Sequence, residues 1–220
     1  MKTYNRIVST NIERLAALAD GIFAVAMTLL VLDLRVPVLE VIHNAQPLWV
    51  SGAVQSEQVL ADALIKLAPR LLTYFMSFLT LGIFWVGQQT QLNHFERTNR
   101  DLTWIHLIFL FAVSIMPFST GLLAEYITFR LALVIYWVNL LVLGIVLYFS
   151  WRYAERNQML KPEVTPEIGM LHKRRVITYQ ALYAFGALLC VFNTYVSIAF
   201  IVLLELNSVI APRIWPLDRF

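Results

Sequence analysis

An aspartate stands inside an apolar run close to the beginning of the chain. The run extends from residue 14 to residue 32, and it contains Asp20 and, about two turns later, Thr28. An ionisable group inside a membrane-spanning helix is costly, so it usually marks a site or a polar network. The run therefore predicts a pore-lining or transport helix.

Asp20 permits two interpretations, a carboxylate that binds an ion directly and one that braces neighbouring helices. Intramembrane carboxylates rarely lack partners, which favours the brace. Arg14 lies six residues away on a different face of the helix, so a partner has to come from another helix. Gln88, Gln89 and His106 are the candidates.

The same run carries an apolar stripe at helical spacing. The stripe consists of Gly21, Val25, Thr28, Leu29 and Leu32. These residues share one face of a helix, and Asp20 lies roughly 140° away from Val25 at about 100° per residue. The face is either a pore with hydrophobic constrictions and a ring of Thr28 hydroxyls, or a surface that faces lipid or packs in the core. Spacing alone favours packing, because the helix is apolar nearly all round.

A second acidic residue, Glu205, lies in the last apolar stretch. It is a candidate proton or cation site, or a carboxylate that reaches water near the end of its helix. The histidines show no metal-ligand spacing, and no nucleophile elbow or phosphate-binding glycine loop is present. The single cysteine, Cys190, excludes a disulfide within the chain. We therefore expect no enzyme activity, no metal site and no cofactor.

Composition places the chain in the membrane. Of its 220 residues, 59% are hydrophobic and 14% are charged, whereas soluble domains have about 45–50% apolar and about 25% charged residues. The net charge of +3 does not indicate nucleic-acid binding, because the basic residues occur where membrane topology places them. The sequence predicts an all-α polytopic membrane protein surrounded by lipid.

Six transmembrane helices are predicted within a single domain, residues 1–220. Their approximate ranges are 14–34, 70–91, 101–125, 130–152, 175–192 and 194–212. The last apolar stretch, 176–212, would be about 55 Å long as one helix, so we divide it near Phe192-Asn193-Thr194. An amphipathic segment with Leu60, Leu64 and Leu67 is expected to extend the second helix outward.

The distribution of basic residues gives the orientation. Twelve lysines and arginines fall in segments that are cytoplasmic if the N-terminus is cytoplasmic, against two to four in the external segments. This asymmetry is what the positive-inside rule describes. We expect a multi-pass protein of the cell (inner) membrane, with both termini in the cytoplasm.

The first helix resembles the signature of the transmembrane protein 175 family of potassium channels. That signature has an arginine, three residues, Phe-Ser-Asp, and an apolar helix with Thr-Leu-Leu. Here Arg14 is followed after three residues by Leu18-Ala19-Asp20, and then by residues 21–30, which end in Thr28-Leu29-Leu30. Residues 74–79, leading to Trp85, and residues 115–119 are similar to further motifs in the second and third helices.

The resemblance implies a six-helix subunit that assembles as a homotetramer and conducts monovalent cations, chiefly K⁺. By register, Val25, Leu29 and Leu32 are then the constriction of the pore, in place of a carbonyl filter. Thr28 is the polar ring associated with selectivity. A structural network that braces the pore helices consists of Arg14, Asp20, Trp85, Gln88 and His106.

Several positions depart from the family pattern. Leu18 and Ala19 replace Phe and Ser, and His106 stands where an asparagine is usual. Gln88 replaces a histidine, so pH sensitivity through that position should be absent, because a glutamine does not titrate. Val25 is smaller than the usual isoleucine or leucine, which would widen the gate.

Two alternatives to a channel remain open at this point. A proton-coupled secondary transporter would use Asp20 and Glu205 as coupling carboxylates, although such proteins often contain internal repeats, and none is clear here. A non-transporting structural membrane protein would pack its first helix in a closed bundle without a pore. The oligomeric state separates this last class from the channel.

Overall fold

The computed structural model describes residues 12–38, 49 and 53–210. The elements, in chain order, are α2 (Ile12–Leu29), η1 (Leu30–Asp33), α3 (Ala53–Ile65), α4 (Ala68–Asn93), α5 (Arg100–Glu125), α6 (Arg130–Arg156), α7 (Pro166–Leu188), η2 (Leu189–Val191) and α8 (Thr194–Val209). Over these ranges, β pairing amounts to one isolated bridge between Phe95 and Leu160. The all-α prediction is confirmed.

Polar side chains set the start of three helices. Asn99, Thr165 and Asn193 each accept a hydrogen bond from a backbone N–H in the first turn of α5, α7 and α8, at 2.9, 3.4 and 2.8 Å. Such N-caps satisfy donors that the helix itself leaves unpaired. Asn193 follows the short helix η2, so the last apolar stretch consists of two helices, α7 and α8.

Within the described residues, four helical runs are long and apolar enough to cross a membrane, namely Ile12–Asp33, Ala68–Asn93, Arg100–Glu125 and Arg130–Arg156. α8 is apolar but has only 16 residues, and the first part of α7 carries the basic run Lys173-Arg174-Arg175. A bilayer core takes about 20 apolar residues in a helix. The count of six spans therefore stays a prediction.

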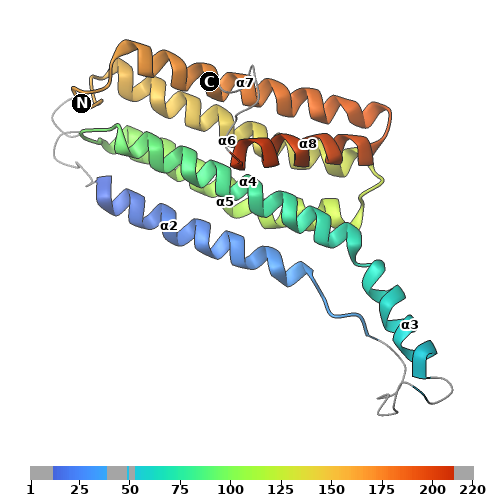
Figure 1. The fold of residues 1–220 in the computed structure, drawn as a ribbon. Helices are drawn as coiled ribbons and strands as arrows, with labels where there is room; N and C mark the ends of the chain where they lie inside the picture. The colour runs from blue at the N-terminus through green and yellow to red at the C-terminus, as the bar shows by residue number, and fades with distance from the viewer. Residues whose placement is uncertain (1–11, 39–48, 50–52, 211–220) are drawn as a thin grey trace.

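The expected outward extension of the second helix is wrong. α3 ends at Ile65 and α4 begins at Ala68, so Lys66 and Leu67 separate two helices, and α3 projects from the end of the bundle (Figure 1). Pro69 lies in the first turn of α4. Because proline has no N–H to donate to the carbonyl four residues earlier, the helix is interrupted before it.

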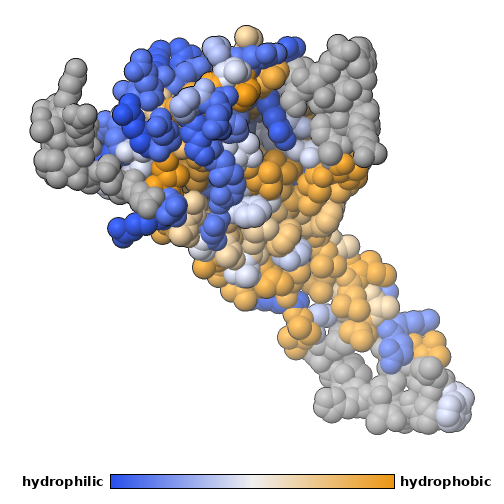
Figure 2. Space-filling model, turned by 60° about the vertical axis from the view of Figure 1, so that its left-hand side comes forward, coloured by the Kyte–Doolittle hydropathy of each residue, from blue (hydrophilic) through white to orange (hydrophobic). Residues whose placement is uncertain are grey.

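The bundle has two sides. α2 packs against α4 and α5, whereas α7 packs against α6 and α8 (Figure 1). Residues 94–99 and 157–165 connect helices at the predicted cytoplasmic end, and residues 66–67 and 126–129 connect them at the predicted outer end. Figure 2 shows hydrophilic residues gathered at one end and hydrophobic residues covering the surface between that end and α3.

An aromatic cluster closes the core at the predicted cytoplasmic end. Trp151 of α6 is fully buried, and the ring of His172 from α7 stacks on it with centroids 4.2 Å apart. Phe95 and His94 pack on the same indole, at 6.2 and 5.7 Å. Burial, together with the charges of His94 and Arg175, lowers the pKa of His172 to about 4. His172 is therefore neutral at pH 7.

This pKa predicts that the fold is less stable in acid. The folded-state pKa of His172 is below its unfolded value, so its contribution is complete above about pH 6.5 and is lost as the pH falls toward 4. Moving from pH 7.5 to pH 5 should cost on the order of 1–2 kcal/mol through this residue. The thermal midpoint in detergent should fall by less in His172→Gln than in the unmodified protein. Equal decreases in the two proteins would contradict the assignment.

A glycine sets the approach of α6 to α7. The side chain of Gln180 crosses α6 at Gly144, so that a Cβ at Gly144 would overlap the Gln180 amide, whose Nε2 donates to the carbonyl of Leu140 at 3.2 Å. Gly144→Val displaces the Gln180 amide from the Leu140 carbonyl and should lower stability by about 1 kcal/mol, the usual contribution of one such hydrogen bond. Gly82→Val is the matched control, because a Cβ at Gly82 meets nothing within 4 Å. Thermal unfolding of both variants tests this, and equal midpoints would contradict it.

Candidate functional site

α2 is buried along one face only. The buried residues of this helix and of η1 recur every three or four positions: Leu15, Ala19, Phe23, Ala26 and Leu30. Phe23 reaches the ring of Phe109 in α5, with centroids 6.0 Å apart. This spacing is the signature of a helix with one packed stripe, although the sequence of α2 is apolar nearly all round.

The opposite face of α2 is uncovered in the single chain. Val25 is 57% exposed, Leu29 43% and Leu32 68%. Thr28 lies beside them, and its hydroxyl donates to the carbonyl of Val25 at 2.8 Å. The hydroxyl proton is thereby used within the helix, so the lone pairs of Oγ1 remain to accept from water or to face a cation.

A shallow apolar groove runs beside this face, between α2 and α5. Its volume is about 590 Å³. On α2 it is lined by Leu18, Gly21, Val25 and Leu29, and on α5 by Leu107, Leu110, Phe111 and Ser114, among others. The uncovered face thus continues onto α5.

Asp20 is held from α4. Its Oδ1 accepts a hydrogen bond from the indole of Trp85 at 2.8 Å and another from the amide of Gln89 at 2.5 Å. Trp85 and Gln89 are four residues apart and share a face of α4, so they clamp one carboxylate oxygen together. Hydrogen bonds to a charged group are about twice as strong as neutral ones.

The structure separates the other members of the predicted network. Gln88 is fully buried on a different face of α4, and its side-chain atoms have no partner among the described residues. His106 pairs with Ser150 at 3.0 Å and so joins α5 to α6. Arg14 is exposed. Of the three partners proposed for Asp20, only Gln89 contacts Asp20. Gln89 lies four residues after Trp85, and this spacing places both donors on one face of α4.

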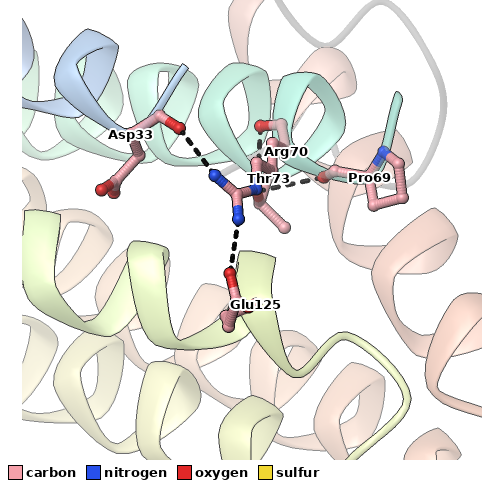
Figure 3. Close-up of polar contacts among 5 residues, drawn as sticks. All are labelled: Asp33, Pro69, Arg70, Thr73 and Glu125. Atoms are coloured by element: carbon pink, nitrogen blue, oxygen red, sulfur yellow. Dashed lines mark hydrogen bonds and ion pairs between the residues drawn. The ribbon is translucent and has the colours of Figure 1, made fainter. Parts of the chain in front are cut away.

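A second polar cluster, which the sequence did not indicate, lies at the predicted outer end of α2. Arg70 of α4 forms an ion pair with Glu125 of α5 at 2.5 Å and donates to the carbonyl of Asp33 at 3.4 Å (Figure 3). A Cβ on Gly121 would lie 2.7 Å from the Asp33 carboxylate, so the Asp33 side chain rests on the backbone of α5. These contacts fix the end of the helical run that begins with α2.

Glu205 belongs to a third polar group, inside the bundle and away from α2. It is fully buried, so it does not reach water at the end of its helix. Thr80 donates to its Oε1, Tyr136 lies 3.0 Å from Thr80, and Ser77 bridges Tyr136 and Thr120 at 3.4 and 2.7 Å. The chain of hydroxyls links α4, α5, α6 and α8.

No set of three or more histidine, cysteine or acidic side chains in the described ranges is arranged to hold a metal ion. The polar groups described above are hydrogen-bonding groups between helices. What distinguishes the molecule is an apolar helix face without cover, positioned by a carboxylate clamp at one end and an arginine cluster at the other.

Comparison with known proteins identifies the family. A sequence profile of the family described as endosomal/lysosomal potassium channel TMEM175 matches residues 14–117. A potassium channel of Streptomyces collinus is 30% identical over 158 residues, which cover 69% of this chain and 68% of that protein. The chain belongs to the TMEM175 family. This agrees with the resemblance seen in the first three predicted helices.

Further TMEM175 relatives extend the comparison over most of the chain. A potassium channel of Chamaesiphon minutus is 29% identical over 176 residues, which cover 79% of this chain and 77% of that protein. The crystal structure of a lysosomal potassium-selective channel TMEM175 homologue from Chamaesiphon minutus matches with a TM-score of 0.73 at 23% identity, over 92% of this chain and 98% of that chain. The fold is therefore that of a TMEM175 homologue.

The clamp on Asp20 predicts a specific loss of stability. Asp20→Ala removes the acceptor and leaves the donors of Trp85 and Gln89 without it, which should cost about 1–3 kcal/mol. Asp20→Asn keeps an acceptor oxygen and should retain most of the stability. The exposed Asp62 of α3 provides the control, Asp62→Asn. Thermal unfolding in detergent ranks the variants, and an unchanged midpoint in Asp20→Ala would overturn the brace.

Proposed function

We propose that this TMEM175-family protein is a potassium-permeable channel and that the exposed face of α2 lines its pore. The observation that carries the proposal is the contrast between the two faces of α2. One face is packed on α4 and α5, and the other leaves Val25, Leu29 and Leu32 largely exposed beside Thr28. The potassium channels among the relatives support the choice of ion.

One α2 helix cannot enclose a pore, so the proposal requires several copies. In a closed ring, the same face of each copy meets the same axis. A homotetramer places four α2 helices around that axis and removes their exposed apolar residues from lipid. The groove between α2 and α5 then faces a neighbouring copy, which supports an interface on this side of the subunit.

The pore has hydrophobic rings rather than a carbonyl filter. Val25, Leu29 and Leu32 lie at successive depths along α2, and rings of such side chains gate by excluding water when they close. Thr28 supplies the one polar ring among them, and its lone pairs face the ion path because its proton is bound to the carbonyl of Val25. We assign the narrowest part to these residues and selectivity to Thr28.

The Asp20 clamp and the polar cluster of Arg70, Glu125 and Asp33 position α2. A helix rotated by one residue turns by about 100°, which would replace the apolar face with a different set of side chains. Asp20 fixes the rotation of α2 against α4 through Trp85 and Gln89. Arg70 and Glu125 fix its other end.

The topology completes the proposal. We infer six spans, with α7 and α8 as the last two, and an N-terminus in the cytoplasm of a cell with this protein in its inner membrane. The positive-inside asymmetry supports this orientation. The proton-coupled transporter is not favoured, because Asp20 and Glu205 belong to separate hydrogen-bonded groups with different partners and the relatives are named as potassium channels.

Potassium flux from liposomes tests the proposal. The purified protein should release K⁺ down its gradient, and Leu29→Trp should reduce the flux at least about tenfold by filling the constriction. Thr28→Val keeps the shape but removes the hydroxyl, so it should change the ratio of K⁺ to Na⁺ permeability more than the total flux.

Ile145→Trp is the matched control for bulk. Ile145 is an exposed apolar residue of α6, on a helix that lies across the bundle from α2 (Figure 1), and its replacement should leave the flux unchanged. If Leu29→Trp conducts as well as Ile145→Trp does, α2 does not line the pore. If the unmodified protein carries no K⁺ current, the channel proposal itself is wrong.

A further inference from the structure

A second groove lies on the side of the bundle away from α2. It has a volume of about 290 Å³ and is lined by residues of α4, α6, α7 and the end of α8. α8 has 16 residues where α7 has 23, so α8 covers only part of the bundle (Figure 1). Ser208 and Val209, near its end, form one edge of the groove.

Small residues make the space within the groove. Gly82, Gly87 and Gly144 line it, together with apolar side chains such as Ile83 and Val176. A Cβ at Gly82 would meet nothing within 4 Å. The groove is thus an apolar slot, and its floor can be filled from Gly82 without moving a neighbour.

The wall of the groove carries polar atoms that lack a partner. Tyr183 is only 2% exposed, and its hydroxyl has no hydrogen bond to any described residue; the same holds for Oε1 of Gln180. An unpaired buried polar group costs about 1–3 kcal/mol. Both atoms are buried, so they are not exposed to an occupant of the groove.

The mouth of the groove is positive. Arg175 lies there, with its guanidinium 5.9 Å from the ring of Tyr179, and it has no carboxylate partner among the described residues. Its neighbour Lys173 is neutralised by Glu155 at 2.8 Å. None of the described residues lining the groove is acidic, and His172 is neutral at pH 7 because burial lowers its pKa to about 4.

The length of the groove matches one leaflet of a bilayer. From His172 to Tyr183 it follows α7 for eleven residues, or about 16 Å at 1.5 Å per residue. Half of a hydrocarbon core of about 30 Å is about 15 Å. Basic pockets between transmembrane helices on the cytoplasmic side are suited to anionic headgroups.

We propose that this groove binds one anionic phospholipid of the cytoplasmic leaflet. An acyl chain lies over Gly82 and Gly87, and the phosphate pairs with Arg175 at the mouth of the groove. Charge complementarity at Arg175 selects an anionic headgroup over a zwitterionic one. The site is independent of the pore, and its test requires no ion flux.

Photolabelling in vesicles tests the site. The full chain is reconstituted in phosphatidylcholine and phosphatidylglycerol, with a trace of one lipid carrying a photoreactive acyl chain. The phosphatidylglycerol probe should label residues 82–90 of α4 and 176–183 of α7 about fivefold more than the phosphatidylcholine probe. That ratio corresponds to about 1 kcal/mol for one arginine near the surface.

Two pairs of variants separate the contributions. Gly82→Leu fills the slot and should abolish the labelling of both segments, whereas Gly82→Ala is too small to fill it and should keep the labelling. Arg175→Gln should remove the preference for phosphatidylglycerol but keep labelling by phosphatidylcholine. Arg174→Gln, at a position that does not line the groove, should keep both.

Three outcomes would overturn the proposal. The first is equal labelling by the two probes in the unmodified protein. The second is labelling that persists in Gly82→Leu. The third is labelling that appears only after removal of residues 211–220. That result would mean that this end of the chain, and not a lipid, occupies the groove in the full-length protein.

Discussion

α2 is held from one side, and the arrangement of the other helices around it depends on this constraint. It packs on α4 and α5 through Ala19, Phe23 and Ala26, and no described part of the chain covers Val25, Leu29 or Leu32. Burying an aliphatic side chain contributes about 1.5–3 kcal/mol in water. In lipid this hydrophobic contribution vanishes, and the association of helices depends on packing and hydrogen bonds. The uncovered face is therefore free to serve a pore only if polar contacts elsewhere hold the helix in place.

Three polar groups hold different helices in place: the Asp20 clamp, the Arg70 cluster and the hydroxyl chain from Glu205 to Thr120. The Asp20 clamp fixes the rotation of α2, and the Arg70 cluster fixes the end of its helical run. The hydroxyl chain from Glu205 to Thr120 holds α4, α5, α6 and α8 together as the platform behind them. Hydrogen bonds between helices inside a membrane favour one arrangement, because any slip leaves their polar groups unpaired.

The sequence predicted the helices well and the side-chain partners in part. Charge-free runs bounded by charges mark α4, α5 and α6. Asp20 could be assigned a brace because intramembrane carboxylates rarely lack partners, and Arg14, on another face, required that partner to come from another helix. Gln89 was one of three candidates for its partner, and only the rotation of α4 decides between Gln88 and Gln89. Contacts such as Arg70 with Glu125 join residues far apart in the chain, so no local spacing reveals them. α3 is separated from α4 because Pro69, in the first turn of α4, has no N–H to continue a helix from α3.

The central claim is that the exposed face of α2 meets the same face of three other copies. Spin labels at Leu32→Cys, in a Cys190→Ser background and in lipid nanodiscs, report the distances between copies. A fourfold ring gives two distances in a ratio of about 1.4, and both should be shorter than the corresponding pair from Ile145→Cys. A single distance, no dipolar coupling, or longer distances from Leu32 than from Ile145 would contradict the account.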